Sequence, residues 1–163
     1  MQKSKSLSFT YTEYGSIEEL PEKYRQIALQ AIEATKLSYS PYSKFAVGAA
    51  LLLSNNEVVL GSNQENGAYP SGLCAERVAL FCAGTTYPNV PVDAMAIAAS
   101  YKGVAIAEPI APCGACRQVM IETQNIGKRP YKVIMIGAKK TVVVDNVSFL
   151  LPFAFSDISN AIK

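Results

Sequence analysis

The chain has 163 residues and a mass of 17.5 kDa, a length that fits one domain over residues 1–163 with a single core. Half of the residues are hydrophobic and 17% are charged, which excludes a disordered chain, and no apolar run approaches the roughly 20 residues that span a bilayer. The net charge of +2 comes from scattered basic residues, and no secretory signal opens the sequence, so we expect a cytoplasmic protein without a nucleic-acid or membrane partner.

The N-terminal part of the chain predicts one amphipathic helix. Residues 1–15 are expected to be an extension ahead of the domain. Ser16 stands three residues before Glu19, which fits a capping box, and Pro21 then suits a first turn. Apolar residues follow at helical spacing, so the helix is expected to end near Tyr39.

The remaining elements alternate between strands and helices, and their order predicts the fold. They are strand 45–53, a turn, strand 58–60, helix 74–84, strand 94–99, helix 113–123, strands 132–136 and 141–144, and a short C-terminal helix. Strand 94–99, the helix after it and strand 132–136 form a βαβ unit, which should be right-handed and parallel. We therefore expect an α/β fold, a three-layer α/β/α sandwich around a mixed sheet of mostly five strands.

Cysteine and histidine usage narrows the chemistry. The four cysteines are Cys74, Cys82, Cys113 and Cys116, and the sequence holds no histidine. In a chain without an export signal, spaced cysteines are more often metal ligands or catalytic groups than disulfides. The lack of histidine excludes imidazole acid–base catalysis and histidine-ligated metals. An enzyme working near neutral pH would need a carboxylate, Cys, Lys or Tyr as its proton carrier.

The segment Pro112-Cys113-Gly114-Ala115-Cys116 places two thiols at positions i and i+3 near a helix start. Residues at this spacing share a helix face with Cβ atoms about 5–6 Å apart. Both sulfurs can then bind one tetrahedral zinc at bonds of about 2.3 Å, and the positive end of the helix favours thiolates there. A thioredoxin-like redox pair is the competing interpretation of this motif.

The segment Cys74-Ala75-Glu76 stands at another predicted helix start and adds a third thiol, with a carboxylate two residues later. Three protein ligands leave one position of a tetrahedral zinc open for water, as in catalytic zinc sites. Glu76 is then the natural proton carrier. Cys82 could be a fourth ligand that closes a structural site, but we expect it to be a small core residue, two turns beyond Cys74.

Together the two motifs resemble the signature of zinc nucleobase deaminases, with Cys74 in the position of the usual histidine. The chain is similar to the homotetrameric, all-cysteine cytidine deaminase family from about Glu22 to Phe155. The segments that carry the resemblance are 40–49 (SPYSKFAVGA), 63–66 (NQEN), 74–77 (CAER), 112–118 (PCGACRQ) and 150–152 (LLP). One departure is Phe153, where the family often has glycine.

The resemblance implies that Cys74, Cys113 and Cys116 bind one zinc ion per subunit and that Glu76 shuttles protons. Zinc with three thiolates and hydroxide carries a charge of about −2, which opposes ionisation of the bound water. Arg77 can offset this charge, because a guanidinium donates hydrogen bonds to thiolate sulfurs. The alternative for Arg77 is a solvated helix arginine.

The resemblance also implies contacts to a nucleoside. Phe45 lies against the pyrimidine, and Asn63 and Glu65 hold the ribose 3′-hydroxyl. The Ala75 amide binds the ring carbonyl, and the Ala111 carbonyl receives the amine. Without the resemblance, Phe45 could be an ordinary core residue of its strand. Asn63 and Glu65 could then belong to an ordinary loop or strand end.

The apolar composition and the uncharged segment 149–155 indicate an obligate homo-oligomer. The resemblance implies a tetramer with shared active sites, in which Phe155 reaches a neighbouring subunit. The alternative is a C-terminal piece that folds back onto its own core.

The expected reaction is hydrolytic deamination of cytidine and deoxycytidine to uridine and deoxyuridine, with release of ammonia, as in pyrimidine salvage. Glu65 would repel a phosphate, which favours a free nucleoside substrate. A related aminopyrimidine nucleoside such as blasticidin S is the alternative substrate. A structural-zinc interaction module using all four cysteines and a dithiol oxidoreductase are the alternatives from other classes.

Overall fold

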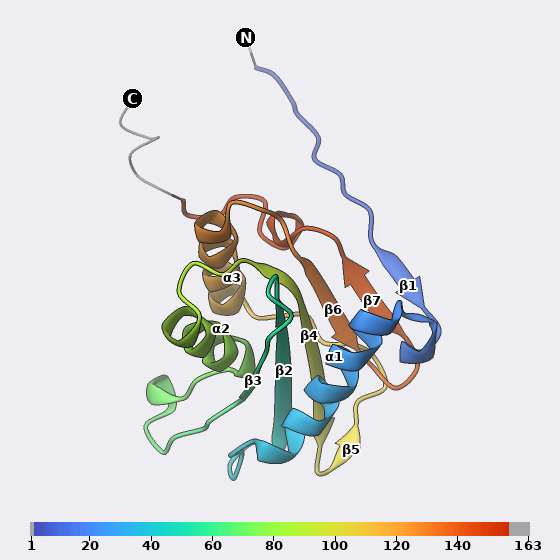
Figure 1. Cartoon of the computed structure of the whole chain (residues 1–163), viewed down its shortest axis with the longest axis vertical. Helices are drawn as coiled ribbons and strands as arrows, with labels where there is room; N and C mark the ends of the chain where they lie inside the picture. Colours follow the sequence, from blue (N-terminus) through green and yellow to red (C-terminus); the bar gives the residue numbers. More distant parts are fainter. Residues whose placement is uncertain (1, 157–163) are drawn as a thin grey trace.

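The computed structural model describes residues 2–156 and builds them around one mixed sheet (Figure 1). Its strands are β1 (Thr12–Tyr14), β2 (Phe45–Leu53), β3 (Val58–Ser62), β4 (Val92–Tyr101), β5 (Val104–Ala105), β6 (Lys132–Ile136) and β7 (Thr141–Val144). The α-helices are α1 (Glu22–Ala34), α2 (Ala75–Thr86) and α3 (Gly114–Gly127). The strands lie in the order β1-β7-β6-β4-β2-β3, with β5 paired to the end of β4.

The sheet is mixed, as expected. Strands β4 and β6 are parallel and are joined through α3, whereas the other pairs of described strands are antiparallel. Helix α1 covers one side of the sheet, and α2 and α3 cover the other (Figure 1). On β4, Ala96 and Ala98 face α1, while Met95 and Ile97 belong to the core under α2 and α3. The three-layer α/β/α architecture predicted from the sequence is therefore confirmed.

Two glycines bring helices directly onto the sheet backbone. A Cβ atom added to Gly48 of β2 would lie 2.1 Å from the carbonyl oxygen of Ala31 in α1. A Cβ atom added to Gly61 of β3 would lie 2.3 Å from the carbonyl oxygen of Ala75, the first residue of α2. Only glycine fits at such distances. Because Ala75 follows Cys74, Gly61 also fixes where the first of the two thiol-bearing helices begins.

The N-terminal helix differs from the prediction. Ser16 caps a short 3₁₀ turn, Ile17–Glu19, and its Oγ accepts a backbone N–H of that turn at 3.3 Å. The buried Leu20 is extended after this turn, which ends the helical path. The backbone carbonyl of Pro21 then accepts the first bonds of α1. The expectation that Ser16 begins the long helix is therefore wrong.

Other differences lie at the ends of elements. Helix α2 continues past Gly84, because the N–H of Tyr87 still donates to the carbonyl of Ala83. Strands β1 and β5 are too short for a hydrophobic period to reveal, and their pairing with β7 and β4 defines them. The last regular element described is a 3₁₀ turn, Val147–Leu150, and a helix within 157–163 would lie outside the described residues. In the part of the chain that the structure describes, every helix is too short or too polar to cross a membrane.

Candidate active site

Three thiols meet where α2 and α3 begin. Cys74 is the N-cap residue of α2, Cys113 is the N-cap residue of α3, and Cys116 lies in the first turn of α3. The Sγ atoms of Cys74 and Cys113 are 4.0 Å apart, those of Cys113 and Cys116 are 3.4 Å apart, and all three lie within 4.8 Å of one another. Two sulfurs on one tetrahedral zinc are about 3.8 Å apart. The cluster is therefore compatible with a zinc ion.

The electrostatics of the cluster favour a thiolate at Cys74. A hydrogen bond from Cys116 and the Arg77 guanidinium lower the pKa of Cys74 to about 5, although burial acts in the opposite direction. The same hydrogen bond, together with burial, raises the pKa of Cys116. Arg77 Nη2 donates to Cys74 Sγ at 3.6 Å. Its buried Nε atom finds no hydrogen-bond partner among the described residues, which leaves one more donor beside the sulfurs.

Glu76 is buried beside the thiols, with only 4% of its surface exposed. Burial raises the pKa of this carboxyl, and the nearby Cys74 thiolate raises it further. A carboxyl with a raised pKa can both accept and return a proton near neutral pH, which is the requirement for a proton carrier. In this chain without histidine, it is a buried carboxyl placed next to a candidate metal site.

A cleft of about 620 Å³ opens beside the cluster, and it contains Asn63, Glu65, Cys74 and Arg77. These residues come from the segment after β3 and from the start of α2. The structure therefore brings the predicted sugar-binding pair to the same cleft as one of the three thiols. Phe45 lies next to this group, because its carbonyl accepts from Asn63 Nδ2 at 2.9 Å.

The hydrogen bonds of Asn63 and Glu65 leave a defined set of free groups. Asn63 Oδ1 accepts from the Val47 N–H at 2.8 Å and from Ser38 Oγ at 2.5 Å. One N–H of its amide remains available after the bond to Phe45. Glu65 Oε2 accepts two backbone N–H groups of the 42–43 loop, at 2.9 and 3.3 Å. One donor and one carboxylate oxygen are thus left to face the cleft.

Two tyrosines in the cleft were not predicted as site residues. The rings of Tyr42 and Tyr69 meet edge to face with centroids 5.9 Å apart, and both line the cleft. Tyr42 belongs to the segment 40–49 that carried the family resemblance, so its place in that segment was the available signal. Tyr69 begins a 3₁₀ turn, Tyr69–Ser71, within a segment of mixed polarity, where no local pattern marks it.

The other predicted residues have varied positions. Ala75 is buried in the first turn of α2, and Ala111 is exposed just before Pro112. Cys82 lies outside the thiol cluster, as expected, but the prediction that it is a core residue is wrong, because it is exposed on α2 and its Sγ lies 3.8 Å from Thr86 Oγ1. Phe155 is 70% exposed and does not line the cleft of its own chain.

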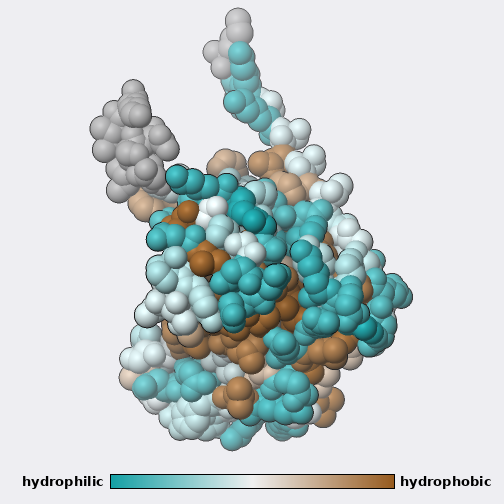
Figure 2. Space-filling view, in the orientation of Figure 1, coloured by the Kyte–Doolittle hydropathy of each residue, from teal (hydrophilic) through white to brown (hydrophobic). Residues whose placement is uncertain are grey.

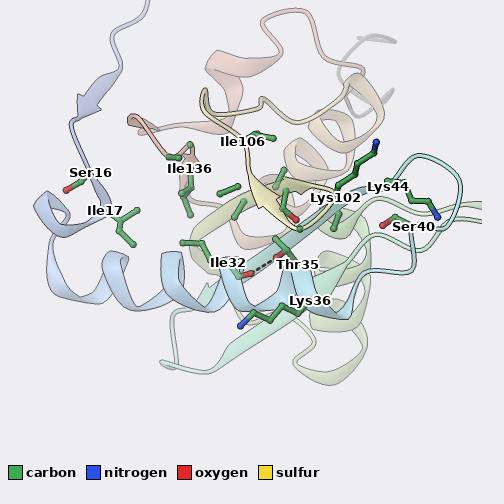
Figure 3. A pocket seen from close by; sticks show the side chains of 18 residues that line it. Ser16, Ile17, Ile32, Thr35, Lys36, Ser40, Lys44, Lys102, Ile106 and Ile136 are labelled. Atoms are coloured by element: carbon green, nitrogen blue, oxygen red, sulfur yellow. Dashed lines mark hydrogen bonds between the residues drawn. The ribbon is translucent and has the colours of Figure 1, made fainter.

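A second hollow, of about 580 Å³, lies on the opposite side of the sheet (Figure 3). Ile17, Ile32 and Ile136 line it, and lysines such as Lys36 and Lys102 stand among its lining residues. Its lining includes no cysteine and no carboxylate. Among the described residues, the candidate metal ligands and the candidate proton carrier Glu76 therefore lie on the side of α2 and α3, not here.

Fold and site together define a class, an α/β protein in which three thiols and a buried carboxyl meet at two helix starts. The family model described as the cytidine and deoxycytidylate deaminase zinc-binding region matches residues 21–133. The chain therefore belongs to this family, and it is an enzyme of the deaminase class.

Individual relatives agree with this assignment. A cytidine deaminase from Halalkalibacterium halodurans is 42% identical over 127 residues, which are 78% of this chain and 89% of the relative. One from Sporosarcina psychrophila is 40% identical over 138 residues, 83% and 95% of the two chains. The crystal structure of cytidine deaminase from Burkholderia pseudomallei matches with a TM-score of 0.67 at 40% identity, covering 80% of this chain and 97% of that one.

Proposed function

We propose that the protein hydrolyses cytidine and deoxycytidine to uridine and deoxyuridine with release of ammonia, a reaction of pyrimidine salvage in the cytoplasm. The observation that carries the proposal is the close group of three thiols beside the buried Glu76, with Cys74 also lining the cleft. The names of the similar proteins support the same reaction.

Cys74, Cys113 and Cys116 would hold one zinc ion per subunit, which supplies a Lewis acid that lowers the pKa of water for attack on C4 of the pyrimidine. Arg77 stabilises the thiolate form of Cys74 through its 3.6 Å contact, and this positive charge offsets part of the negative charge of three thiolates. The Arg77 Nε donor can satisfy a second sulfur or the substrate.

Glu76 carries the protons of the reaction. It takes one proton from the attacking water and delivers it to ring atom N3, and it takes the second and delivers it to the departing amine. The C4–N bond then breaks, ammonia leaves, and the oxygen from water remains as the C4 carbonyl. Its raised pKa, caused by burial, supports both halves of this shuttle. The Ala75 amide would bind the ring carbonyl, the Ala111 carbonyl would receive the amine, and Phe45 would lie against the ring.

The free groups of Asn63 and Glu65 fit a sugar hydroxyl. A hydroxyl both accepts and donates, and the pair offers one N–H donor and one carboxylate oxygen. Hydrogen bonds from Ser43 and the backbone lower the pKa of Glu65, so its charge is negative at neutral pH. This charge favours the ribose 3′-hydroxyl over a phosphate, and hence a free nucleoside over a nucleotide or a polynucleotide. Both sugars should be accepted, because the 3′-hydroxyl that Asn63 and Glu65 are proposed to bind is present in cytidine and in deoxycytidine.

We also propose that residues 1–163 form one domain and assemble as a homotetramer with shared active sites, in which Phe155 lies over a neighbour's base. Large apolar side chains are exposed on the described residues, among them Leu60, Phe81 and Ile126. Figure 2 shows an apolar band across the middle of one face, bordered by polar residues. Such surfaces often mark interfaces. The start of the C-terminal segment packs onto its own core, because Leu150 is buried. Its end is free to contact a neighbouring subunit, because Phe155 is exposed.

The decisive experiment is incubation of the purified protein with cytidine, deoxycytidine and cytidine monophosphate, read by loss of ultraviolet absorbance and by chromatography of the products. Both nucleosides should be converted, and the monophosphate should react far more slowly. Blasticidin S is the runner-up substrate and belongs in the same panel. No turnover of any of these with a full complement of zinc would overturn the proposal and favour a structural-zinc module. Light scattering of the same sample tests the tetramer.

A further inference from the structure

The backbone of Phe155 is held at two points by the side-chain amide of Gln118. Gln118 Nε2 donates to the Phe155 carbonyl oxygen at 2.8 Å, and the Phe155 N–H donates to Gln118 Oε1 at 3.2 Å. A primary amide that pairs with both the N–H and the C=O of one residue copies a rung of a β-ladder. The pairing therefore fixes both the position and the direction of the chain at Phe155.

Helix α3 also holds the start of the same terminal segment. Arg117 Nη1 donates to the Leu150 carbonyl at 2.9 Å, and its Nε donates to the Pro112 carbonyl at 2.7 Å. Between these attachments, Leu151 and Ala154 pack against the core under α2 and α3. Residues 150–155 are thus attached to two consecutive residues of one helix, and the exposed ring of Phe155 projects from the second attachment.

We infer that Gln118 is a positioning residue, which presents the ring of Phe155 to the base-binding site of a second copy of this chain. This inference rests on the proposed function, in which Phe155 lies over a neighbour's pyrimidine. The first turn of α3 carries Cys116, and the next two residues, Arg117 and Gln118, hold the terminal segment. One helix therefore links the candidate metal site of one copy to the residue that would complete the site of another. A loose chain at Phe155 would have to be ordered each time that substrate binds.

The test is the steady-state kinetics of Gln118→Ala. The KM for cytidine should rise about tenfold, the size that loss of two neutral hydrogen bonds allows, while kcat stays within about twofold of the parent. Zinc content, Tm and oligomeric state should not change. Gln124→Ala is the matched control, because Gln124 is the same residue type on the same helix but donates to Ser148 Oγ at 2.9 Å. Its KM should equal that of the parent.

Two further measurements separate positioning from general weakening. In the double variant Gln118→Ala/Phe155→Ala, KM should be no higher than in Phe155→Ala alone, because Gln118 is proposed to act only through that ring. Independent, additive increases would overturn the inference. Amide hydrogen exchange at Phe155 should be slow in the parent and fast in Gln118→Ala, whether or not substrate is present. If the parent is active and Gln118→Ala keeps the parental KM, the positioning role is refuted but the proposed function is not. If the zinc-loaded parent deaminates no substrate, both the proposed function and this inference are refuted.

Discussion

The two faces of the sheet are built alike but differ in chemistry. On each face a helix presses onto a glycine, α1 onto Gly48 and α2 onto Gly61, at similar distances. Each face also has a hollow of similar size. Nevertheless, the clustered thiols and the buried Glu76 lie only on the side of α2 and α3, within the described residues. Close packing and a cavity are therefore not sufficient to make an active site.

The difference lies in how the helices begin. Helix α1 begins after Pro21, and the acidic residue of its first turn, Glu22, accepts hydrogen bonds from the side chains of Arg25 and Gln26. Helices α2 and α3 each begin at a cysteine, and the two starts meet. The unpaired N–H groups and positive ends of both helices then act on the same sulfurs, which stabilises thiolates. Five variants, one pair among them, test this comparison in four predictions, from the largest expected effect to the smallest.

Glu76→Gln should abolish nearly all turnover while leaving the fold and the metal in place. Proton transfer by one positioned side chain contributes about 10²–10⁴ in rate, and this carboxyl acts at more than one step. The amide has nearly the same shape and removes a buried ionisable group, so Tm should not fall. Uridine formation and metal content measured on the same preparation check both expectations. A variant within tenfold of the parent would show that another group carries the proton.

Cys113→Ser should lose most of its zinc and become less stable, because metal binding is coupled to folding. Cys113 is the sulfur in contact with both others, so its removal opens the cluster at the centre. Elemental analysis and a thermal melt with and without added zinc provide the readout. Full zinc occupancy with an unchanged melt would show that the cluster is not the metal site.

Gly61→Ala and Gly48→Ala form a matched pair across the sheet. Each adds one methyl group against a helix backbone, and each should destabilise the protein by about 1–3 kcal/mol. Only Gly61→Ala displaces the start of α2, so only this variant should also lower kcat/KM of the folded protein, by about tenfold to 100-fold. Denaturant unfolding and activity below the melting transition separate the two effects. If Gly61→Ala and Gly48→Ala lose equal activity per folded molecule, the proposed functional difference between the two faces of the sheet is wrong.

Cys82→Ala should change almost nothing, because this thiol is exposed and lies outside the cluster. Zinc content and kcat should match the parent, and the stability change should stay within about 0.5 kcal/mol. If zinc is lost instead, the four cysteines form a closed structural site and the open catalytic site is wrong.

Some features of the molecule could be predicted because their signals are local. Strands β6 and β7 match their predicted ranges, since short apolar runs between turns define them. The two thiol motifs predicted helix starts, and the structure has helices at both. The exposure of Cys82 could not be deduced from its apolar neighbours, because the buried face of α2 is set by Ala79 and Ala83. Whether the roles assigned to the substrate-binding residues are right stays a prediction.

Contacts between distant residues carried no sequence signal. Gln118 and Phe155 are 37 residues apart, and neither neighbourhood shows a pattern that pairs them. The approach of Gly61 to Ala75 likewise depends on where α2 lies against β3, which follows from the packing of the whole face. Such contacts become visible only when the elements are in place.

The side chain of Asn63 connects the proposed sugar-binding group to the strand that carries Phe45. One end of its amide bonds the Phe45 carbonyl and the other bonds the Val47 N–H, so the side chain is part of the edge of β2 that carries Phe45. With the proposed roles, a sugar hydroxyl bound to this amide would act on the same strand as the base. A nucleoside without its 3′-hydroxyl should consequently lose more than one hydrogen bond, and changes to sugar and base should combine non-additively. With the proposed roles, the protein would recognise the sugar and the base together, as one unit of fixed length.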